Sequence, residues 1–222
     1  MSTPPPPRQP LTRERIIRAA LALIDEAGLE GLTMRRLGSE LGVEAMSLYK
    51  HVPNKDAILD GIREHLLGDF AAALPTGEPE DWRDDLTRFA RSYRALGRAH
   101  PEAFSLLARA PERAYVAGGD IAELGLRRLM AAGLDQETAI RAQRSVVRFV
   151  LATSLLEQAT DDAPAPVPAE EIAALATARP LIGDLMRSLG PASDDAQFEF
   201  GLQAMLGGIG LVIAGTSGPG AA

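Results

Sequence analysis

Residues 32–55 read LTMRRLGSELGVEAMSLYKHVPNK, and this stretch predicts two short amphipathic helices joined by a turn. Thr33 is a favourable N-cap for a helix that runs to Leu41, and Gly42 suits the left-handed residue that ends such a helix. A second short helix is expected over residues 45–51, with Leu48 facing inward. Two short helices joined by a tight turn are a common arrangement for placing a helix in the major groove of DNA.

Polar side chains on and beside the second helix are suited to DNA contacts. Tyr49 offers a flat ring and a hydroxyl, Lys50 can reach guanine acceptors or a phosphate, and Lys55 lies at a helix N-terminus that favours anions. A short polar helix is also common on a solvated surface, so the prediction depends on the spacing, the caps and Lys55 taken together. The candidates from residue chemistry are Arg35, Ser47, Tyr49, Lys50, His51 and Lys55.

The rest of the chain predicts an all-α protein, because helical periodicity recurs throughout and no segment alternates as a strand. The clearest apolar stripe is Trp82, Leu86, Phe89, Tyr93 and Leu96, with Arg88, Arg91, Arg94 and Arg98 expected largely on the other sides. Further helices are expected over 101–110 (ended by Pro111), 119–132, 135–158, 169–189 (kinked at Pro180) and 194–214.

This periodicity predicts four regions. Residues 1–10 are proline-rich and are expected to be disordered, and 216–222 form a flexible tail. Residues 11–58 form a three-helix helix-turn-helix DNA-binding domain. Residues 59–215 form a larger helical domain, to which the family resemblance described below assigns ligand binding and dimerisation.

Charge and composition narrow the class of protein. The net charge is −7, yet the first 65 residues hold nine basic and nine acidic residues, so the excess of acid lies in the remainder. DNA contact would therefore depend on a local cluster of cations. The absence of cysteine fits a reducing cytoplasm. The apolar run near residues 206–214 is shorter than the roughly 20 residues that span a bilayer, so a cytoplasmic protein without membrane contact is expected.

No pattern in the sequence indicates an enzyme, a cofactor or a metal site. The histidines are His51, His65 and His100, and none stands at triad spacing from a serine or a carboxylate. The chain lacks the nucleophile-elbow, phosphate-loop, dinucleotide and zinc-protease motifs. Neighbouring acids such as Asp84 and Asp85 lie close to helix starts, where capping explains them.

Residues 32–62 resemble the DNA-binding domain of the tetracycline-repressor family, through residues 41–44, 48–52 and 54–59, and the match continues without gaps to Pro111. A weaker similarity returns at residues 197–202. The resemblance implies binding to a double-stranded, palindromic DNA operator as a homodimer, formed through the last two long helices. It places DNA contacts at Met34, Arg35, Met46, Ser47, Tyr49, Lys50, His51 and Lys55. Gly201, Ala204 and Gly208 share one face of the last helix, where small residues would allow close packing; a flexible tail is the alternative.

The resemblance also bears on what the protein senses. In the tetracycline repressors a His, an Asn and a His hold drug and magnesium, and the matching positions here are Ala71, Phe89 and Leu107. We therefore predict no magnesium–tetracycline binding at that site, since magnesium needs oxygen ligands. A pocket for a small apolar or aromatic effector is expected instead, unless its aromatic rings serve only core packing. Its candidate residues are Phe89, Tyr93, His100, Phe104, Leu107, Gln143 and Thr153.

The function expected from these observations is a ligand-responsive repressor. The effector would release it from its operator. A dimeric small-molecule-binding protein without specific DNA binding is the alternative.

Overall fold

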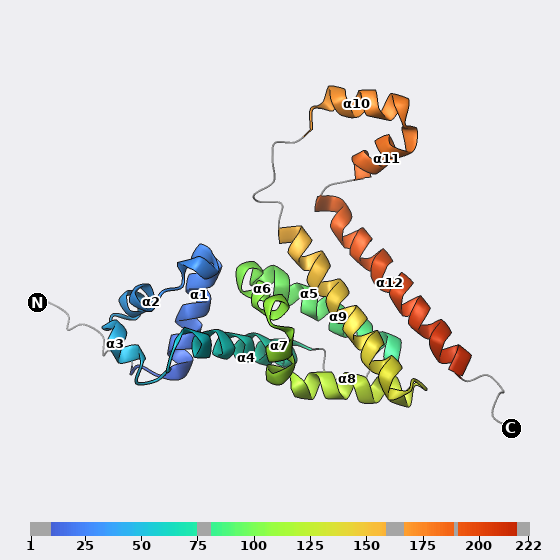
Figure 1. Ribbon diagram of the computed structural model, residues 1–222. Coiled ribbons are helices and arrows are strands. Elements are labelled where there is room, and N and C mark those ends of the chain that lie inside the picture. The colour runs from blue at the N-terminus through green and yellow to red at the C-terminus, as the bar shows by residue number, and fades with distance from the viewer. Residues whose placement is uncertain (1–9, 75–80, 159–166, 189–190, 217–222) are drawn as a thin grey trace, which may run out of the picture. The chain divides into compact units, whose positions relative to one another are not determined.

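The computed structural model describes residues 10–74, 81–158, 167–188 and 191–216 (Figure 1). Within these ranges the chain forms twelve helices and no strand, which confirms the all-α prediction. By packing, the chain divides into two compact units. The first contains the described residues up to Ala73 together with 100–119, and the second contains 74–99 and the residues from Asp120 onward. The sequence predicted a boundary between a DNA-binding domain ending at residue 58 and a regulatory domain beginning at residue 59. That functional boundary differs from the division by packing and stays a prediction.

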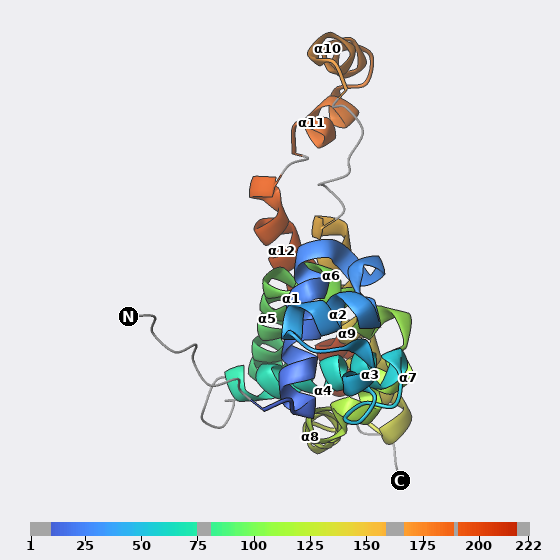
Figure 2. The ribbon, with the colours of Figure 1, turned by 90° about the vertical axis from the view of Figure 1, so that its left-hand side faces the viewer.

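Six helices form the first unit. They are α1 (Arg13–Gly31), α2 (Met34–Leu41), α3 (Ala45–Leu48), α4 (Lys55–Ala73), α6 (Pro101–Arg109) and α7 (Pro111–Ala117). Helix α1 packs against α2, α4 and α6, and α7 packs against α4 and α6; Figure 2 shows this group from the side of α1 and α2. Its core consists of fully buried apolar side chains, among them Ile16, Ile24, Leu37, Leu48, Ile58, Ile62, Leu66, Phe104 and Leu107.

The second unit contains the remaining helices: α5 (Trp82–Ala99), α8 (Gly119–Ala131), α9 (Gln136–Gln158), α10 (Ala169–Ala178), α11 (Pro180–Ser188) and α12 (Pro191–Thr216). Helix α5 packs against α9 and α12, α9 packs against α12, and α10 packs against α11. The apolar stripe expected on α5 points inward at Leu86, Tyr93 and Leu96, which are buried.

Prolines account for two differences from the expected helices. Pro111 was expected to end a helix, but it also begins α7, where its fixed φ and missing N–H suit the first helical position. Residue Arg179, which precedes Pro180, is extended (φ −142°, ψ 81°), because the proline ring disfavours helical geometry in the residue before it. The expected kinked helix is therefore two helices, α10 and α11.

Arg94 departs from the expected solvent-facing position, since it is only 6% exposed. Its guanidinium pairs with Glu157 of α9 at 2.6 Å and with Asp195 of α12 at 2.8 Å. It also lies over the Phe198 ring, 4.3 Å from the centroid. These contacts join α5, α9 and α12 around one buried cation.

Helix α12 is more apolar and longer than the run noted in the sequence. Its segment Asp195–Gly215 has a mean hydropathy of 1.5 and is 22% buried, which by length and composition would suffice to cross a membrane. The side chains of Phe200 and Leu211 are 72% and 77% exposed. A helix with this much uncovered apolar surface calls for a covering partner.

Candidate functional site

Residues 32–55 form the expected helix caps and the expected helix stop. The Thr33 hydroxyl accepts a hydrogen bond from the Arg36 amide at 3.1 Å and caps α2. Gly42 ends α2 in the left-handed conformation, with φ 68° and ψ 33°. Asn54 accepts a hydrogen bond from the Ala57 amide at 2.8 Å and caps α4. We call residues 33–55, which run from this first cap into α4, the reading head.

Gly38 has a role in the reading head that the sequence did not reveal. A Cβ atom at this position would lie 2.9 Å from the Val43 carbonyl oxygen and 3.2 Å from the Ala45 amide nitrogen. Both neighbours are backbone atoms, so they cannot rotate away as a side chain would. Only glycine therefore lets α2 approach the start of α3 this closely.

The α-helical part of the second short helix is shorter than expected, ending at Leu48, and the chain continues in tight turns. The amides of His51 and Val52 donate to the Leu48 carbonyl at 2.9 and 3.0 Å. The Leu48 side chain is fully buried and that of Val52 is 1% exposed. The buried side chains fix the orientation of this segment, so that Met46 (74% exposed), Tyr49 (44%) and the adjacent Lys50 and His51 face outward.

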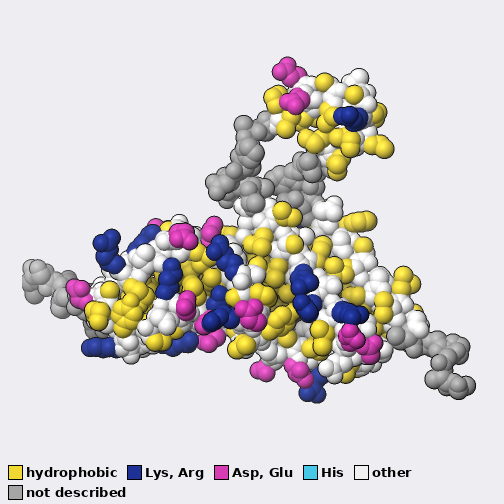
Figure 3. Space-filling model, in the orientation of Figure 1, with side chains coloured by type: hydrophobic (Ala, Val, Ile, Leu, Met, Phe, Trp, Pro, Cys, Tyr) yellow, Lys and Arg dark blue, Asp and Glu magenta, His cyan; other side chains and the backbone are white. Residues whose placement is uncertain are grey.

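The basic residues of the reading head are exposed. Arg35, Lys50, His51 and Lys55 are exposed, and none has an ion-pair partner within the part of the chain that the structure describes. Arg36, by contrast, pairs with Glu26 at 3.5 Å. Figure 3 shows Lys and Arg side chains on the surface of the region that contains α1–α3. Of the other expected contacts, Met34 and Ser47 are half-buried.

Two polar contacts join the later helices of the first unit to the earlier ones. His100 Nδ1 lies 2.8 Å from Asp25 Oδ2 on α1. Arg63 of α4, only 6% exposed, donates to the Leu106 carbonyl at 3.3 Å and pairs with Asp60 at 2.7 Å. The expected pocket residues His100, Phe104 and Leu107 therefore belong to the first unit.

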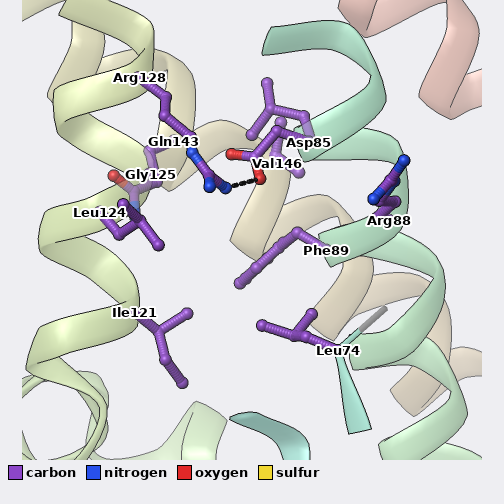
Figure 4. A pocket seen from close by; sticks show the side chains of 11 residues that line it. Leu74, Asp85, Arg88, Phe89, Ile121, Leu124, Gly125, Arg128, Gln143 and Val146 are labelled. Carbon is purple, nitrogen blue, oxygen red and sulfur yellow. Dashed lines mark hydrogen bonds and ion pairs between the residues drawn. The ribbon is translucent and has the colours of Figure 1, made fainter. Parts of the chain in front are cut away.

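A cavity of about 190 Å³ lies in the second unit, between α5, α8 and α9 (Figure 4). Of the seven expected pocket residues, it brings together Phe89 and Gln143. Tyr93 is buried and stacks on Phe89, with 5.4 Å between centroids. The Thr153 hydroxyl donates to the Phe149 carbonyl of its own helix at 2.9 Å. The apolar lining consists of Leu74, Leu86, Phe89, Ile121, Leu124 and Val146.

The cavity also has a polar side that the sequence did not indicate. Asp85 and Arg128 both line it and form an ion pair, although capping alone had been expected of Asp85. Burial raises the pKa of the Asp85 carboxyl above its ordinary value, against the lowering effect of Arg128. The actual cap of α5 is Asp81, whose carboxylate accepts from the amides of Arg83 and Asp84. The adjacency of two acids in the sequence gave no sign of a partner 43 residues away.

Gln143 is the second polar feature of the cavity wall. Its Nε2 donates to the Ala122 carbonyl at 3.0 Å, which fixes the orientation of the amide. Its Oε1 is buried and lacks a hydrogen-bond partner among the described residues. A buried acceptor without a donor costs about 1–3 kcal/mol.

The positions matched to the drug-and-magnesium ligands offer no metal-binding atoms. Ala71 is exposed and Leu107 is buried in the first unit, and Phe89 lines the cavity of the second. Across the described ranges, no group of three or more His, Asp or Glu side chains is arranged to hold a metal ion. The exclusion of magnesium–tetracycline stays a prediction.

Comparison with known families covers both units. Residues 16–62 match the family model for bacterial regulatory proteins of the tetR family, and residues 74–213 match the tetracyclin repressor-like C-terminal domain. The chain is 34% identical over 208 residues to the tetracycline repressor protein class A from transposon 1721 of Escherichia coli, covering 92% of this chain and 94% of that protein.

Solved structures agree with this assignment. A TetR variant from Acinetobacter baumannii AYE in complex with minocycline is 28% identical with a TM-score of 0.72, covering 96% of this chain and all of that one. BioQ with its natural double-stranded DNA operator is 26% identical with a TM-score of 0.65, covering 90% and 98% of the two chains. With both domain models matched in order along one all-α chain, this protein belongs to the tetracycline-repressor family of bacterial transcriptional regulators.

Proposed function

We propose that this protein is a repressor that binds a palindromic DNA operator as a homodimer and is released by a small apolar or aromatic effector. The observation that carries the proposal is that Arg35, Lys50 and Lys55 of the capped reading head are exposed and have no ion-pair partner among the described residues. The DNA contacts we assign are Met34, Arg35, Met46, Ser47, Tyr49, Lys50, His51 and Lys55.

Each part of the reading head has a distinct task in this proposal. Tyr49 and Lys50 face outward beside the buried Leu48, so they are the side chains best placed to reach base edges in the major groove. Lys55 lies in the first turn of α4, where the capped helix N-terminus adds to its attraction for a phosphate. Phosphate contacts fix the register of the helix, and base contacts select the sequence.

Dimerisation through α9 and α12 is supported by the apolar surface of α12. Phe200, Leu211 and Val212 are exposed on this helix, and a Cβ atom at Gly207 or Gly208 would have no neighbour within 4 Å. Gly201, expected on the packing face, instead lies against Phe149 of the same chain. A two-fold dimer would present two reading heads to the two halves of a palindrome. Covering α12 with a second copy also accounts for its hydropathy.

The cavity between α5, α8 and α9 is the effector site that we propose, and we call it the effector cavity. The relatives in complex with minocycline and with operator DNA support the two halves of the function, each for its own protein. Release from DNA follows if the effector binds one conformation of the protein better than the one that grips the operator.

The decisive experiment is a gel-shift titration of the purified chain against its own upstream DNA, repeated over a series of salt concentrations. We expect a specific complex whose affinity falls steeply with salt, with a slope of about −0.9 per phosphate contacted. Light scattering should report a dimer. A dimer that binds small molecules but enriches no sequence from randomised oligonucleotides would favour the alternative, a ligand-binding protein without specific DNA recognition.

A second experiment tests the exclusion of magnesium–tetracycline. Tetracycline with magnesium should leave the protein–operator complex intact, because Ala71, Phe89 and Leu107 supply no metal ligand. Drug-dependent release that a chelator abolishes would contradict this prediction.

A further inference from the structure

The charges around the effector cavity cancel one another. Arg128 pairs with Asp85, and Arg88 pairs with Asp84 at 2.6 Å, so each cation of the lining has a carboxylate partner. Figure 4 shows the Asp85–Arg128 pair reaching from one helix to the other on the same side of the cavity as Gln143. A charged ligand would have to break a pair or remain unpaired in a partly buried site, and either is costly. This lining therefore favours an uncharged ligand.

The same pair offers an acceptor and donors side by side. The Asp85 carboxylate accepts hydrogen bonds, and the Arg128 guanidinium donates them. A hydroxyl group both donates and accepts, so it can bond to the two partners without separating them. Gln143 also lines the cavity, and its buried Oε1 has no partner among the described residues. The polar side of the cavity thus matches a neutral donor group.

The size of the cavity limits the ligand to a compact molecule. Its volume of about 190 Å³ is somewhat larger than the roughly 150 Å³ cavity that accommodates benzene. Gly125 also lines the cavity, and a Cβ atom there would lie 3.3 Å from Gln143 Nε2. The apolar wall that includes Phe89, Ile121 and Leu124 suits the faces of one or two fused rings.

We propose that the effector is an uncharged aromatic molecule of one or two rings that carries a hydroxyl group bonded at the Asp85–Arg128 pair. This inference rests on the proposed effector function and narrows it to phenol-like compounds. It excludes aryl carboxylates, aromatic amines in their ammonium form and large multi-ring drugs as the best ligands of this cavity.

The test is a calorimetric titration of the full chain with four probes of matched ring size. They are β-naphthol, its methyl ether, β-naphthoate and β-naphthylmethylammonium. We expect β-naphthol to bind most tightly. The ether, which lacks the donor, should bind about tenfold more weakly, as should both ions.

A variant at Asp85 tests the charge argument by changing the relative affinities for neutral and charged probes. Asp85→Asn removes the negative charge that pairs with Arg128 in the lining, so the preference for β-naphthol over β-naphthoate should shrink or invert, a change of about tenfold. Glu123→Gln is the matched control: it removes the same charge from an exposed i,i+4 pair with Arg127 on α8, outside the lining. The control should keep the wild-type order of affinities.

The outcomes separate the two proposals. Equal or tighter binding of either ion to the wild-type chain, equal binding of the ether, or no binding of any probe would overturn the ligand class. Because the wild-type series decides this, the inference stays testable even if Asp85→Asn folds poorly. Operator binding is measured in parallel: if the gel shift persists while the probes fail, only the ligand class is wrong. If no DNA is retarded, the regulator proposal fails independently of calorimetry.

Discussion

The reading head and the α5–α9–α12 bundle use basic residues in opposite ways. In the reading head, Arg35, Lys50 and Lys55 are exposed, and no ion pair to them is found in the described residues. In the bundle, Arg94 and Arg98 share Glu157 and Asp195, and Arg91 forms a two-point pair with Glu199 at 2.8 and 2.9 Å. We therefore propose that the exposed cations of the reading head serve phosphates, whereas the paired cations of the bundle hold helices together. The variants below test that division of labour.

The largest effect is expected from Arg94→Met. Arg98 is half exposed and still pairs with Glu157, but the variant removes the more deeply buried of the two cations on this carboxylate, which is 16% exposed, and should lower the free energy of unfolding by about 3 kcal/mol. Chemical denaturation measures it. Arg127→Met is the control, because Arg127 is 73% exposed and its loss should change stability by less than about 0.5 kcal/mol. Equal stability of the two variants would show that the buried network contributes nothing.

Lys50→Ala should have the converse effect, on binding instead of stability. Loss of a base or phosphate contact costs about 1–3 kcal/mol, or roughly tenfold to a hundredfold in operator affinity. The unfolding midpoint should stay unchanged, since Lys50 is exposed. Arg127→Ala, in an exposed pair with Glu123 on α8, serves as the control and should retain full DNA affinity. A Lys50 variant with wild-type affinity would remove this residue from the interface.

Gly38→Ala probes the scaffold beneath the reading head. Its Cβ atom would press on the Val43 carbonyl, so the two short helices must separate, at a cost of about 1–3 kcal/mol and with loss of operator binding. Gly68→Ala makes the same chemical change in α4, where no atom lies within 4 Å, and should stabilise the protein by about 0.5–1 kcal/mol. Thermal unfolding of both variants checks the pair, and opposite signs are expected.

The smallest expected effect is a loss of thermal stability at low pH. The hydrogen bond from Arg98 holds the pKa of Asp195 below its ordinary 3.8, and that from Arg91 holds the pKa of Glu199 below 4.5. A lowered pKa stabilises the fold above the ordinary value, and that contribution disappears as the pH falls through the folded-state pKa. Thermal stability should therefore decline from about pH 5 to about pH 3. The double variant Asp195→Asn/Glu199→Gln should decline less over the same interval.

The sequence predicted what depends on neighbouring residues. Thr33 was assigned as a cap and Gly42 as a stop, because each acts through hydrogen bonds or dihedral angles within a few residues. The all-α class and the family resemblance, which were confirmed, also rest on local patterns, namely helical periodicity and short motifs. The assigned DNA contacts and the effector pocket remain predictions.

What the sequence did not reveal depends on distant partners. Arg94 was placed on an outer face by helical spacing, yet Glu157 and Asp195 make its burial possible. Gly38 looks like any helical glycine until the Val43 carbonyl is beside it. Asp85 acquires its role only from Arg128, which belongs to another helix. No periodicity in one segment reports which groups a second segment brings near.

The two-part composition of the first unit has a consequence for synthesis. Its chain is interrupted by α5, because residues up to Ala73 and residues 100–119 belong to the same unit. As the polypeptide leaves the ribosome, α1 and α4 emerge before Phe104 and Leu107, which α6 carries into the core against them. Until α6 has emerged, the apolar faces of α1 and α4 are exposed and can bind chaperones or aggregate. A gene truncated after Ala73 should therefore yield an aggregation-prone fragment. A soluble DNA-binding fragment should require the chain through Gly119.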